Sequence, residues 1–415
     1  MSNVRELAVR AKNASRKLAT LDRKAKDAAL GAVAAALRAN KERIFAANKG
    51  DLEAARAAGV PAPMLDRLRM DEKVLESTAQ GVEYIVSLPD PVGSRSGMQR
   101  LQSGVLAGRE RVPLGVIAMV YEARPNVTVD AAALCLKSGN AVLLRGGKEA
   151  QQTNQVLGAV LHSALESTAV PADAVQIVPA GDREGIREML SLSDLIDLAI
   201  PRGGEGLIRF VAENARVPVI KHYKGVCHMF LDAGCDAEMA ARLAVNGKVQ
   251  RPSACNALEC LLVHSADAQR VLPPVAAALL AAGAELRGCA RTREIVKEAK
   301  AASDEDWGME YLANILAVRV VDDLDAALEH VARYGSNHTD AICTENYQHA
   351  QRWLREVDAS CVLVNASTRF NDGGQLGLGA EIGISTSKLH AYGPMGLDSL
   401  TTEKWVLYGE GQIRG

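Results

Sequence analysis

The spacing of hydrophobic positions changes about a quarter of the way along the chain. Over residues 1–90 apolar residues recur at helical spacing, which predicts several helices, one of them over Leu21–Asn40 with Thr20 as its cap. Two short alternating runs follow, at Met98–Leu101 and Val105–Arg111, and they predict a β-hairpin. The first part of the chain is therefore expected to be helical and to end in a hairpin.

After the hairpin, short apolar runs alternate with amphipathic stretches. The first series of expected strands is Val112–Tyr121, Ala141–Leu144, Val175–Val178, Leu195–Ile200 and Val217–Lys221, with helices at 125–138, 151–167, 183–190 and 205–214. The second series, from about residue 226, has expected strands at 257–263, 314–321, 341–343 and 361–365, with helices at 237–249, 267–281, 291–301, 323–333 and 346–356. Alternating strands and helices predict an α/β fold with two doubly wound parallel sheets, and a cleft between two such domains is a common place for a site.

Composition excludes several classes of protein. The 415 residues include 48 basic and 50 acidic side chains, and only 4% are aromatic. A charge balance this even gives no basis for a nucleic-acid or membrane-surface partner. The eight cysteines contain no CxxC pair, and no apolar run approaches the roughly 20 residues that span a bilayer. We expect a cytoplasmic enzyme or binding protein with no metal site, since His330 and His338 have no cysteine or carboxylate at ligand spacing.

Cys255 stands out by its context. It lies in a loop of small residues, from Gln250 to Asn256, between an expected helix and an expected strand. A thiol on such a loop can face a cleft, and a nearby cation such as Arg251 would increase its thiolate fraction. The alternative is an inert buried cysteine, which is the interpretation we keep for Cys260 within the strand.

Glycine-rich turns follow two strands of the first series. Gly139–Glu149 carries Arg145, Gly146, Gly147 and Lys148, and Pro201–Gly206 carries Arg202, Gly203 and Gly204. Glycines let backbone amides approach a ligand, and cations or a helix N-terminus favour phosphate. Neither turn has the GxGxxG pattern, and each could serve only the turn itself. Together they indicate a dinucleotide site.

A polar segment leaves the first strand of the sheet. Arg124 and Asn126 follow Tyr121 directly. Ligands of parallel sheets gather at the carboxyl ends of strands, so both side chains could face a substrate. Simple turn and helix-cap chemistry is the alternative.

These motifs together resemble the γ-glutamyl phosphate reductase family within the aldehyde dehydrogenase superfamily. The resemblance spans nearly the whole chain and rests on Tyr121–Thr128, Gly139–Lys148, Pro201–Gly204, the Cys255 loop, Val321–Ile342 and Val364–Phe370. Val331 stands where the family usually has isoleucine, and Tyr392 where it commonly has arginine. We expect Tyr392 to tune an interface or local charge.

The resemblance implies an aldehyde-dehydrogenase-like fold with a small β oligomerisation element. It implies an NADPH-binding domain over 1–97 and 112–225, a catalytic domain over 226–370, and a bridging and oligomerisation element over 98–111 and 371–415. The implied partners are further copies of the chain and, in function, glutamate 5-kinase.

The implied reaction is the second step of proline biosynthesis from glutamate. NADPH reduces L-glutamate 5-phosphate to L-glutamate 5-semialdehyde, with phosphate released and a thioester formed on Cys255. The residues implied to bind the cofactor are Arg145, Gly146, Gly147, Lys148, Arg202, Gly203 and Gly204. Those implied to bind substrate are Arg124, Asn365 and Arg369, and the implied oxyanion donors are Asn126 and the Cys255 amide.

The chemistry of the segment Lys221–Gly225 agrees with a reductase. Hydrolytic aldehyde dehydrogenases typically use a glutamate to activate water, and the corresponding stretch here, Lys221–Gly225, has no carboxylate. A thioester would therefore survive until it is reduced. The alternatives left open are a CoA-acylating aldehyde dehydrogenase and a non-catalytic relative kept for binding or assembly.

Overall fold

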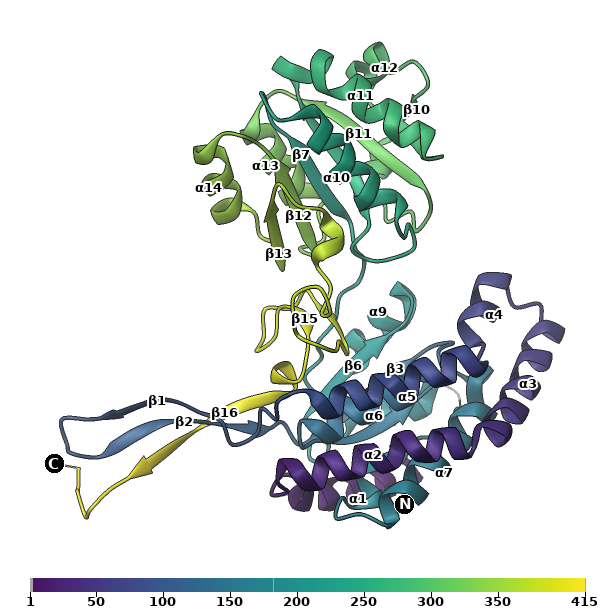
Figure 1. The fold of residues 1–415 in the computed structure, drawn as a ribbon, viewed down its shortest axis with the longest axis vertical. Coiled ribbons are helices and arrows are strands. Elements are labelled where there is room, and N and C mark those ends of the chain that lie inside the picture. The colour runs from purple at the N-terminus through teal and green to yellow at the C-terminus, as the bar shows by residue number, and fades with distance from the viewer. Residues whose placement is uncertain (1–2, 182, 415) are drawn as a thin grey trace.

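The protein consists of two α/β units and a small, projecting antiparallel sheet (Figure 1). The structure is a computed structural model that describes residues 3–181 and 183–414. Within that part of the chain, no helix is both long and apolar enough to cross a membrane. The predicted α/β fold with two parallel sheets is confirmed.

The first unit is built around a parallel four-stranded sheet in the order β5-β4-β3-β6. Its strands are β3 (Val116–Tyr121), β4 (Ala141–Arg145), β5 (Val175–Ile177) and β6 (Leu198–Arg202). Its helices are α1 (Asn3–Leu18), α2 (Arg23–Ala39), α3 (Lys41–Ala57), α4 (Ala62–Leu68), α5 (Glu72–Ser87), α6 (Asn126–Lys137), α7 (Gln151–Glu166), α8 (Arg183–Ser191) and α9 (Glu205–Asn214). Every residue of β3 and β4 is buried, which is why both read as continuous apolar runs.

The strand order of this unit fixes where a ligand can bind. β3 lies between β4 on one side and β6 on the other. The chain leaves β3 toward β4 and returns later to β6, so the topology reverses between β3 and β6. The crevice at the carboxyl ends of these two strands is the expected binding place in an open parallel sheet.

The second unit has a seven-stranded sheet in the order β10-β9-β11-β8-β7-β12-β13, with all its pairs parallel. Its strands are β7 (Cys227–Leu231), β8 (Leu258–His264), β9 (Glu285–Gly288), β10 (Lys300–Ala301), β11 (Ile315–Val321), β12 (Thr339–Cys343) and β13 (Cys361–Val364). Its helices are α10 (Ala237–Val249), α11 (Ala268–Ala281), α12 (Ala290–Ile295), α13 (Leu324–Tyr334) and α14 (Tyr347–Glu356).

The remaining strands link and extend the two units. The predicted hairpin is confirmed as β1 (Arg95–Arg100) and β2 (Leu106–Pro113), and β16 (Thr401–Tyr408) pairs with β2 in a sheet that projects from the first unit (Figure 1). The short strands β14 (Gly383–Ser385) and β15 (Gly393–Met395) pair with each other. After the second unit, the chain returns to the first unit over residues 382–400. Apolar side chains of this returning segment are buried in the core of the first unit. The functional boundaries of the domains stay a prediction.

Several sequence-based expectations were wrong in detail. The cap of α2 is Asp22, whose carboxylate accepts from the Ala25 amide, and not Thr20. The apolar run at 112–121 is divided because β2 ends at Pro113 and β3 begins at Val116.

Two further expectations were also wrong. Val217–Lys221 makes only an isolated bridge to the sheet, through Val219. The helix expected over 291–301 ends at Ile295, and the chain goes on to the edge strand β10. The strands β7, β9 and β10 were not predicted; β9 and β10 are short, with four and two residues.

Candidate active site

Cys255 lies on the loop between α10 and β8, directly before β8 begins at Leu258. The loop is held tightly from behind. A side chain on Gly225 would collide with the carbonyl oxygen of Cys255, so only glycine fits at that position. The same carbonyl accepts a hydrogen bond from the buried Cys227 thiol at 3.3 Å. Cys255 itself is half-buried.

Two histidines flank the Cys255 thiol. One ring nitrogen of His222, one of His338 and Sγ of Cys255 all lie within 4.8 Å of one another. His222 precedes β7 and His338 precedes β12, so the cluster forms at the amino ends of three neighbouring strands, β8, β7 and β12. Arg202 at the end of β6 and Arg124 after β3 both interact electrostatically with Cys255, so this edge of the second sheet lies near the carboxyl ends of β3 and β6.

Hydrogen bonds and burial fix the state of both histidines. His222 donates from Nδ1 to the carbonyl oxygen of Ile384 at 2.9 Å, and Nδ1 of His338 lies 2.7 Å from Oγ1 of Thr339. Burial lowers the pKa of His222 below its ordinary value, and Arg202 lowers it further. Burial and the neighbouring His222 lower the pKa of His338 to about 3. Both imidazoles are therefore neutral at pH 7, and His338 is the weaker base of the two.

The Cys255 thiol sits in a field of opposing charges. Burial raises its pKa to about 11, and the carboxylates of Glu381 and Glu310 act in the same direction, whereas Arg202 lowers it. The free thiol is the resting form, and it needs a base or an incoming cation to become a nucleophile. A neutral imidazole within reach supplies such a base.

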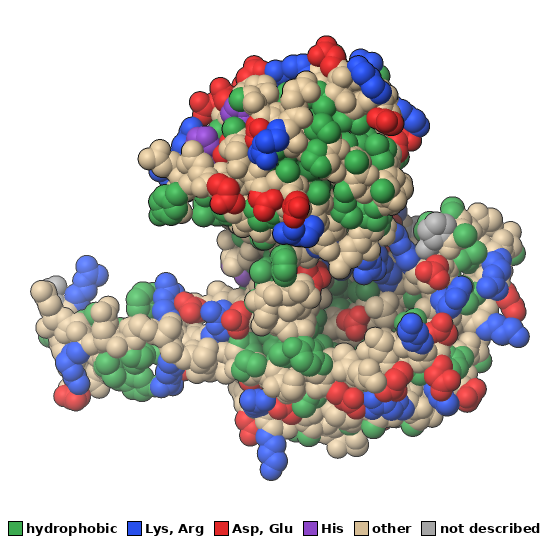
Figure 2. Space-filling view, turned by 45° about the horizontal axis from the view of Figure 1, so that its top comes forward, with side chains coloured by type: hydrophobic (Ala, Val, Ile, Leu, Met, Phe, Trp, Pro, Cys, Tyr) green, Lys and Arg blue, Asp and Glu red, His purple; other side chains and the backbone are tan. Residues whose placement is uncertain are grey.

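Arginines from separate elements converge next to Cys255. Burial lowers the pKa of Arg124, and repulsion from Arg202, Arg67 and Arg251 lowers it further, while Cys255 opposes the shift. Arg67 comes from α4, Arg124 follows β3, Arg202 ends β6 and Arg251 belongs to the Cys255 loop. In the space-filling view, Lys and Arg side chains line the hollow between the two units (Figure 2). Guanidinium groups held this close repel one another, and a phosphate dianion would relieve that repulsion.

Arg369 joins this group from the second unit. Its Nε donates to Oε1 of Gln250 at 2.9 Å, and its pKa is lowered by burial and by Arg251. Two of the three predicted substrate-binding residues, Arg124 and Arg369, thus lie in the electrostatic environment of Cys255. The third, Asn365, lies elsewhere. The side chain of Asn365 makes two hydrogen bonds to the backbone of Thr344. Its Oδ1 accepts from the Thr344 amide and its Nδ2 donates to the Thr344 carbonyl oxygen, both at 2.9 Å.

Two cations of the turn after β4, Arg145 and Lys148, are predicted to bind the cofactor, and the structure places them in different surroundings. Arg145 is buried and donates to the carbonyl oxygens of Gly146 and Gly181, at 2.9 and 2.7 Å. Lys148 is exposed. The guanidinium of Arg145 thus shapes two loops, and Lys148 is the cation of this turn that a ligand can reach. A side chain on Gly146 or Gly147 would meet the ends of the Asn154 or Glu149 side chains, which would have to move.

The turn after β6 is occupied by a carboxylate of the chain itself. Glu122 Oε2 accepts from the Gly204 amide at 2.9 Å, and a side chain on Gly203 would collide with it. Arg202, predicted as a cofactor residue, has its guanidinium beside Gly383 and influences Cys255, so it belongs to the cysteine side of the crevice. Asn126 begins α6 at the same edge, and its Nδ2 donates to Oδ2 of Asp130 at 3.0 Å. Burial raises the pKa of Asp130 to about 6.

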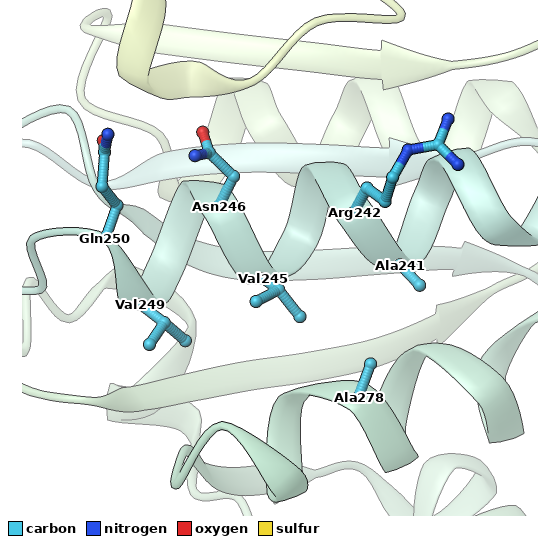
Figure 3. Close-up of a pocket in the computed structure, with 7 residues that line it drawn as sticks. All are labelled: Ala241, Arg242, Val245, Asn246, Val249, Gln250 and Ala278. Atoms are coloured by element: carbon cyan, nitrogen blue, oxygen red, sulfur yellow. The ribbon is translucent and has the colours of Figure 1, made fainter.

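A wide cavity elsewhere in the second unit lacks this chemistry. It has a volume of about 550 Å³ and lies between α10 and α11. Figure 3 shows Val245 and Val249 of α10 facing Ala278 of α11, while Arg242 and Asn246 point away from that helix. An apolar lining without a nucleophile or an acid does not compete with the Cys255 cluster as an active site.

Comparison with known proteins agrees with this site. Residues 1–288 match the model of the aldehyde dehydrogenase family. A γ-glutamyl phosphate reductase of Sorangium cellulosum is 63% identical over 416 residues, covering 99% of this chain and 97% of the relative. The crystal structure of γ-glutamyl phosphate reductase from Thermotoga maritima is 42% identical and superposes with a TM-score of 0.98, covering 100% of both chains. An engineered glycolyl-CoA reductase with bound NADP+ shares the fold, with 13% identity, a TM-score of 0.67, and coverage of 98% of this chain and 96% of its own.

The fold and a thiol at the junction of two α/β units define a class, and the chain belongs to the aldehyde dehydrogenase family. Within that family it is a member of the γ-glutamyl phosphate reductases, which are oxidoreductases. The resemblance found in the sequence is confirmed.

Proposed function

We propose that the chain reduces L-glutamate 5-phosphate to L-glutamate 5-semialdehyde with NADPH and releases phosphate, as the second step of proline biosynthesis. The observation that carries the proposal is the electrostatic interaction of Arg124 and Arg202 with the Cys255 thiol, while Arg251 and Arg67 in turn interact with Arg124. An acyl phosphate places its carbonyl carbon one bond from the phosphate. A site that binds the phosphate through arginines and holds a thiol beside it positions the thiol for attack on that carbon.

The first step needs a base for the Cys255 thiol. His222 supplies it, because its Nδ1 proton is committed to Ile384 and its remaining basic atom is Nε2. As the proton moves to this nitrogen, Sγ bonds to the γ-carbonyl carbon, and the bond to the phosphate oxygen breaks. The leaving phosphate carries away the negative charge and stays bound among the arginines. The product on the protein is a thioester of Cys255.

Donors for the developing oxyanion come from the edge of the first sheet. Asn126 Nδ2 carries two hydrogens, and only one is used by Asp130. The second is available for the carbonyl oxygen, together with the backbone amide of Cys255. Asp130 holds the amide side chain of Asn126 in one orientation, and this preorganisation lowers the cost of stabilising charge in the transition state.

The carboxyl ends of β3 and β6, where the strand order reverses, are the place that we propose for a nicotinamide dinucleotide. Family members use nicotinamide cofactors, and bound NADPH supplies a hydride to the thioester carbon. Of the charged groups at the first sheet, the exposed Lys148 suits the 2′-phosphate, whereas Arg145 shapes the loops behind it. Gly146 and Gly147 have no side chain that would separate the backbone of this turn from a ligand. Collapse of the thiohemiacetal on Cys255 then frees the aldehyde and restores the thiolate.

Assembly and location follow from the same family membership. We propose a cytoplasmic homo-oligomer that works in sequence with glutamate 5-kinase. The projecting sheet supports the oligomer. β1 is exposed along its length, and Trp405 and Leu407 of β16 each keep 60% of their surface exposed.

Trapping the thioester tests the proposal. The chain is mixed with glutamate 5-semialdehyde and NADP+ in the absence of phosphate, quenched rapidly in acid, and analysed by peptide mass spectrometry. The proposal predicts a γ-glutamyl adduct on the Cys255 peptide, which disappears when phosphate is added before the quench. An adduct on another cysteine, or one that CoA but not phosphate removes, would overturn it.

A further inference from the structure

A second cluster of two histidines and one cysteine lies deeper in the second unit. One ring nitrogen of His228, one of His330 and Sγ of Cys260 lie within 4.8 Å of one another, and all three residues are buried. No sequence motif predicts this cluster, because His228 is on β7, Cys260 on β8 and His330 on α13. We expected His330 to have no cysteine partner because none lies at ligand spacing in the sequence. In the folded chain, Cys260 lies beside it.

The first observation that points to a ligand is an orphaned nitrogen. His228 is fully buried, and its Nε2 has no nitrogen or oxygen partner among the described residues, while the Cys260 thiol is the side chain that interacts with it. A buried polar atom without a partner is uncommon and costs stability. The other nitrogen, Nδ1, lies 3.2 Å from Oδ1 of Asp340 and 3.1 Å from the carbonyl oxygen of Val226. Both partners accept, so Nδ1 donates to them, and Nε2 is the nitrogen of this ring that could bind a metal ion.

The second observation is the spacing of the ligand atoms. Sγ of Cys260 and Nε2 of His330 are 3.6 Å apart. Tetrahedral zinc has bonds of about 2.3 Å to sulfur and about 2.05 Å to nitrogen, which places two such ligands about 3.6 Å from each other. The carboxylate of Asp340 on His228 is also the outer contact that orients metal-binding histidines in proteins.

We propose that His228, Cys260 and His330 bind a zinc ion, which ties β7 and β8 to α13. The set of two imidazoles and one thiolate is one that zinc prefers, with a fourth position left for water or a small anion. A cavity of about 180 Å³ reaches the cluster, since His330 and Tyr334 belong to its lining. It provides a route for the ion and room for the fourth ligand.

One neighbour must move for the ion to bind. Arg319 donates to Nδ1 of His330 at 3.0 Å, which places the proton of the neutral ring on Nε2. Coordination through Nε2 moves that proton to Nδ1, and Arg319 has to withdraw into the cavity that it lines. Arg319 therefore competes with the metal, and this competition supplies a test that leaves the ligands untouched.

The ion would also stabilise the neighbouring active site. α13 ends at Tyr334, and the chain then passes through Ser336, whose hydroxyl accepts from the Val226 amide at 2.8 Å, to His338 beside Cys255. Fixing His330 to β7 and β8 anchors the helix from which this loop departs. The zinc site itself does not depend on the proposed reaction.

The test uses cobalt(II) as a spectroscopic probe on the full chain, after chelator treatment and in the presence of a non-thiol reductant. Cys255→Ser is the starting variant, so that the active-site cluster cannot supply a thiolate. We expect one cobalt ion per chain, with the near-ultraviolet absorption of a thiolate–cobalt bond. Adding Cys260→Ser should abolish that absorption, whereas adding Cys361→Ser, a half-buried cysteine on β13, should leave it unchanged. Absence of the absorption in Cys255→Ser, or its persistence with Cys260→Ser, would overturn the proposal.

Two further variants test the site if Cys260→Ser fails to fold. Arg319→Gln removes the competing donor and places an acceptor near Nδ1, so zinc affinity, measured by competition with a chromophoric chelator, should rise at least tenfold. Asp340→Asn weakens the outer contact and should lower affinity by about 10- to 100-fold. Unchanged zinc affinity in both variants, or no zinc binding by either, contradicts the assignment.

Discussion

His222 donates its Nδ1 proton to the carbonyl oxygen of Ile384, over 2.9 Å and across 162 residues of sequence. This bond comes from the returning segment that carries β14, and it fixes the tautomer of the ring. The lone pair of Nε2 is thereby the basic atom left for the Cys255 thiol. A segment predicted as a bridging element thus takes part in forming the active site.

Replacing His222 should therefore lower turnover and leave binding nearly unchanged. We expect His222→Gln to reduce kcat by about two to four orders of magnitude, the usual contribution of a general base. His264→Asn, at the far end of β8, is the matched control and should keep kcat. A fall in kcat for both variants, or for neither, contradicts the assignment.

The pH dependence of kcat/KM should report the same base. The pKa of His222 lies below its ordinary value because of burial and Arg202. The base works when neutral, so activity should persist as pH falls through 6.5 and decline only at lower pH. The acid limb of the profile should vanish in His222→Gln. A decline that begins above pH 7 would point to a different group.

Asn126 is predicted to stabilise the oxyanion. Loss of one such donor costs about 2.7–4 kcal/mol in the transition state, so Asn126→Ala should lower kcat by two to three orders of magnitude with little change in NADPH affinity. Steady-state kinetics with both substrates varied measures this. An unchanged kcat with a raised KM for the acyl substrate would assign Asn126 to ground-state binding instead.

Binding of the substrate phosphate and binding of NADPH should depend on different cations, Arg124 and Lys148. Charge-assisted hydrogen bonds are worth about 1.5–3 kcal/mol, so Arg124→Gln should raise the KM for phosphate in the reverse reaction at least about tenfold. Lys148→Gln should raise the Kd for NADPH more than that for NADH and leave the KM for phosphate unchanged. An equal loss of both cofactors in Lys148→Gln would give that residue a structural role.

A buried ion pair behind the active site should dominate local stability. Lys248 Nζ and Glu259 Oε2 are 2.6 Å apart and fully buried. Lys248→Met leaves the carboxylate without its partner and should destabilise the fold by about 3–5 kcal/mol, whereas Lys248→Met with Glu259→Leu should recover much of the loss. Denaturant unfolding of both variants measures this, and equal losses would contradict it.

The loss of stability in Lys248→Met should depend on pH because the Glu259 carboxyl group titrates. Burial raises the pKa of Glu259 to about 7, against the effect of Lys248. A pKa above the unfolded value favours folding at low pH, and this contribution disappears as pH rises toward 7. Lys248→Met should therefore be less destabilised at pH 5 than at pH 8.

The sequence was sufficient for the fold, and it proposed some of the residues that interact with Cys255 in the structure. Buried strands such as β3 and β4 appear as apolar runs, and the turns after them carry visible glycines and charges. The sequence also identified Cys255, Arg124 and Arg369, which the fold places close together. What it lacked was the orientation of the second sheet, which meets the first with its amino ends.

The orientation of the second sheet explains why sequence reasoning missed two residues beside Cys255. His222 and His338 precede β7 and β12, whereas ligand residues were sought after strands. Arg67 comes from a short helix that carries no motif of its own. Asn365 was carried over from a motif, yet its positive φ of 52° and its two bonds to Thr344 show that it shapes a turn. Such roles depend on contacts between distant segments.

The dependence of turnover on phosphate tests the proposed function most directly. The wild-type chain is supplied with glutamate 5-semialdehyde and NADP+, and formation of NADPH is followed with and without inorganic phosphate or CoA. We predict sustained NADPH formation only with phosphate, and a loss of about three or more orders of magnitude in Cys255→Ser. Sustained turnover without phosphate, a requirement for CoA, or near-normal activity of Cys255→Ser would contradict the account.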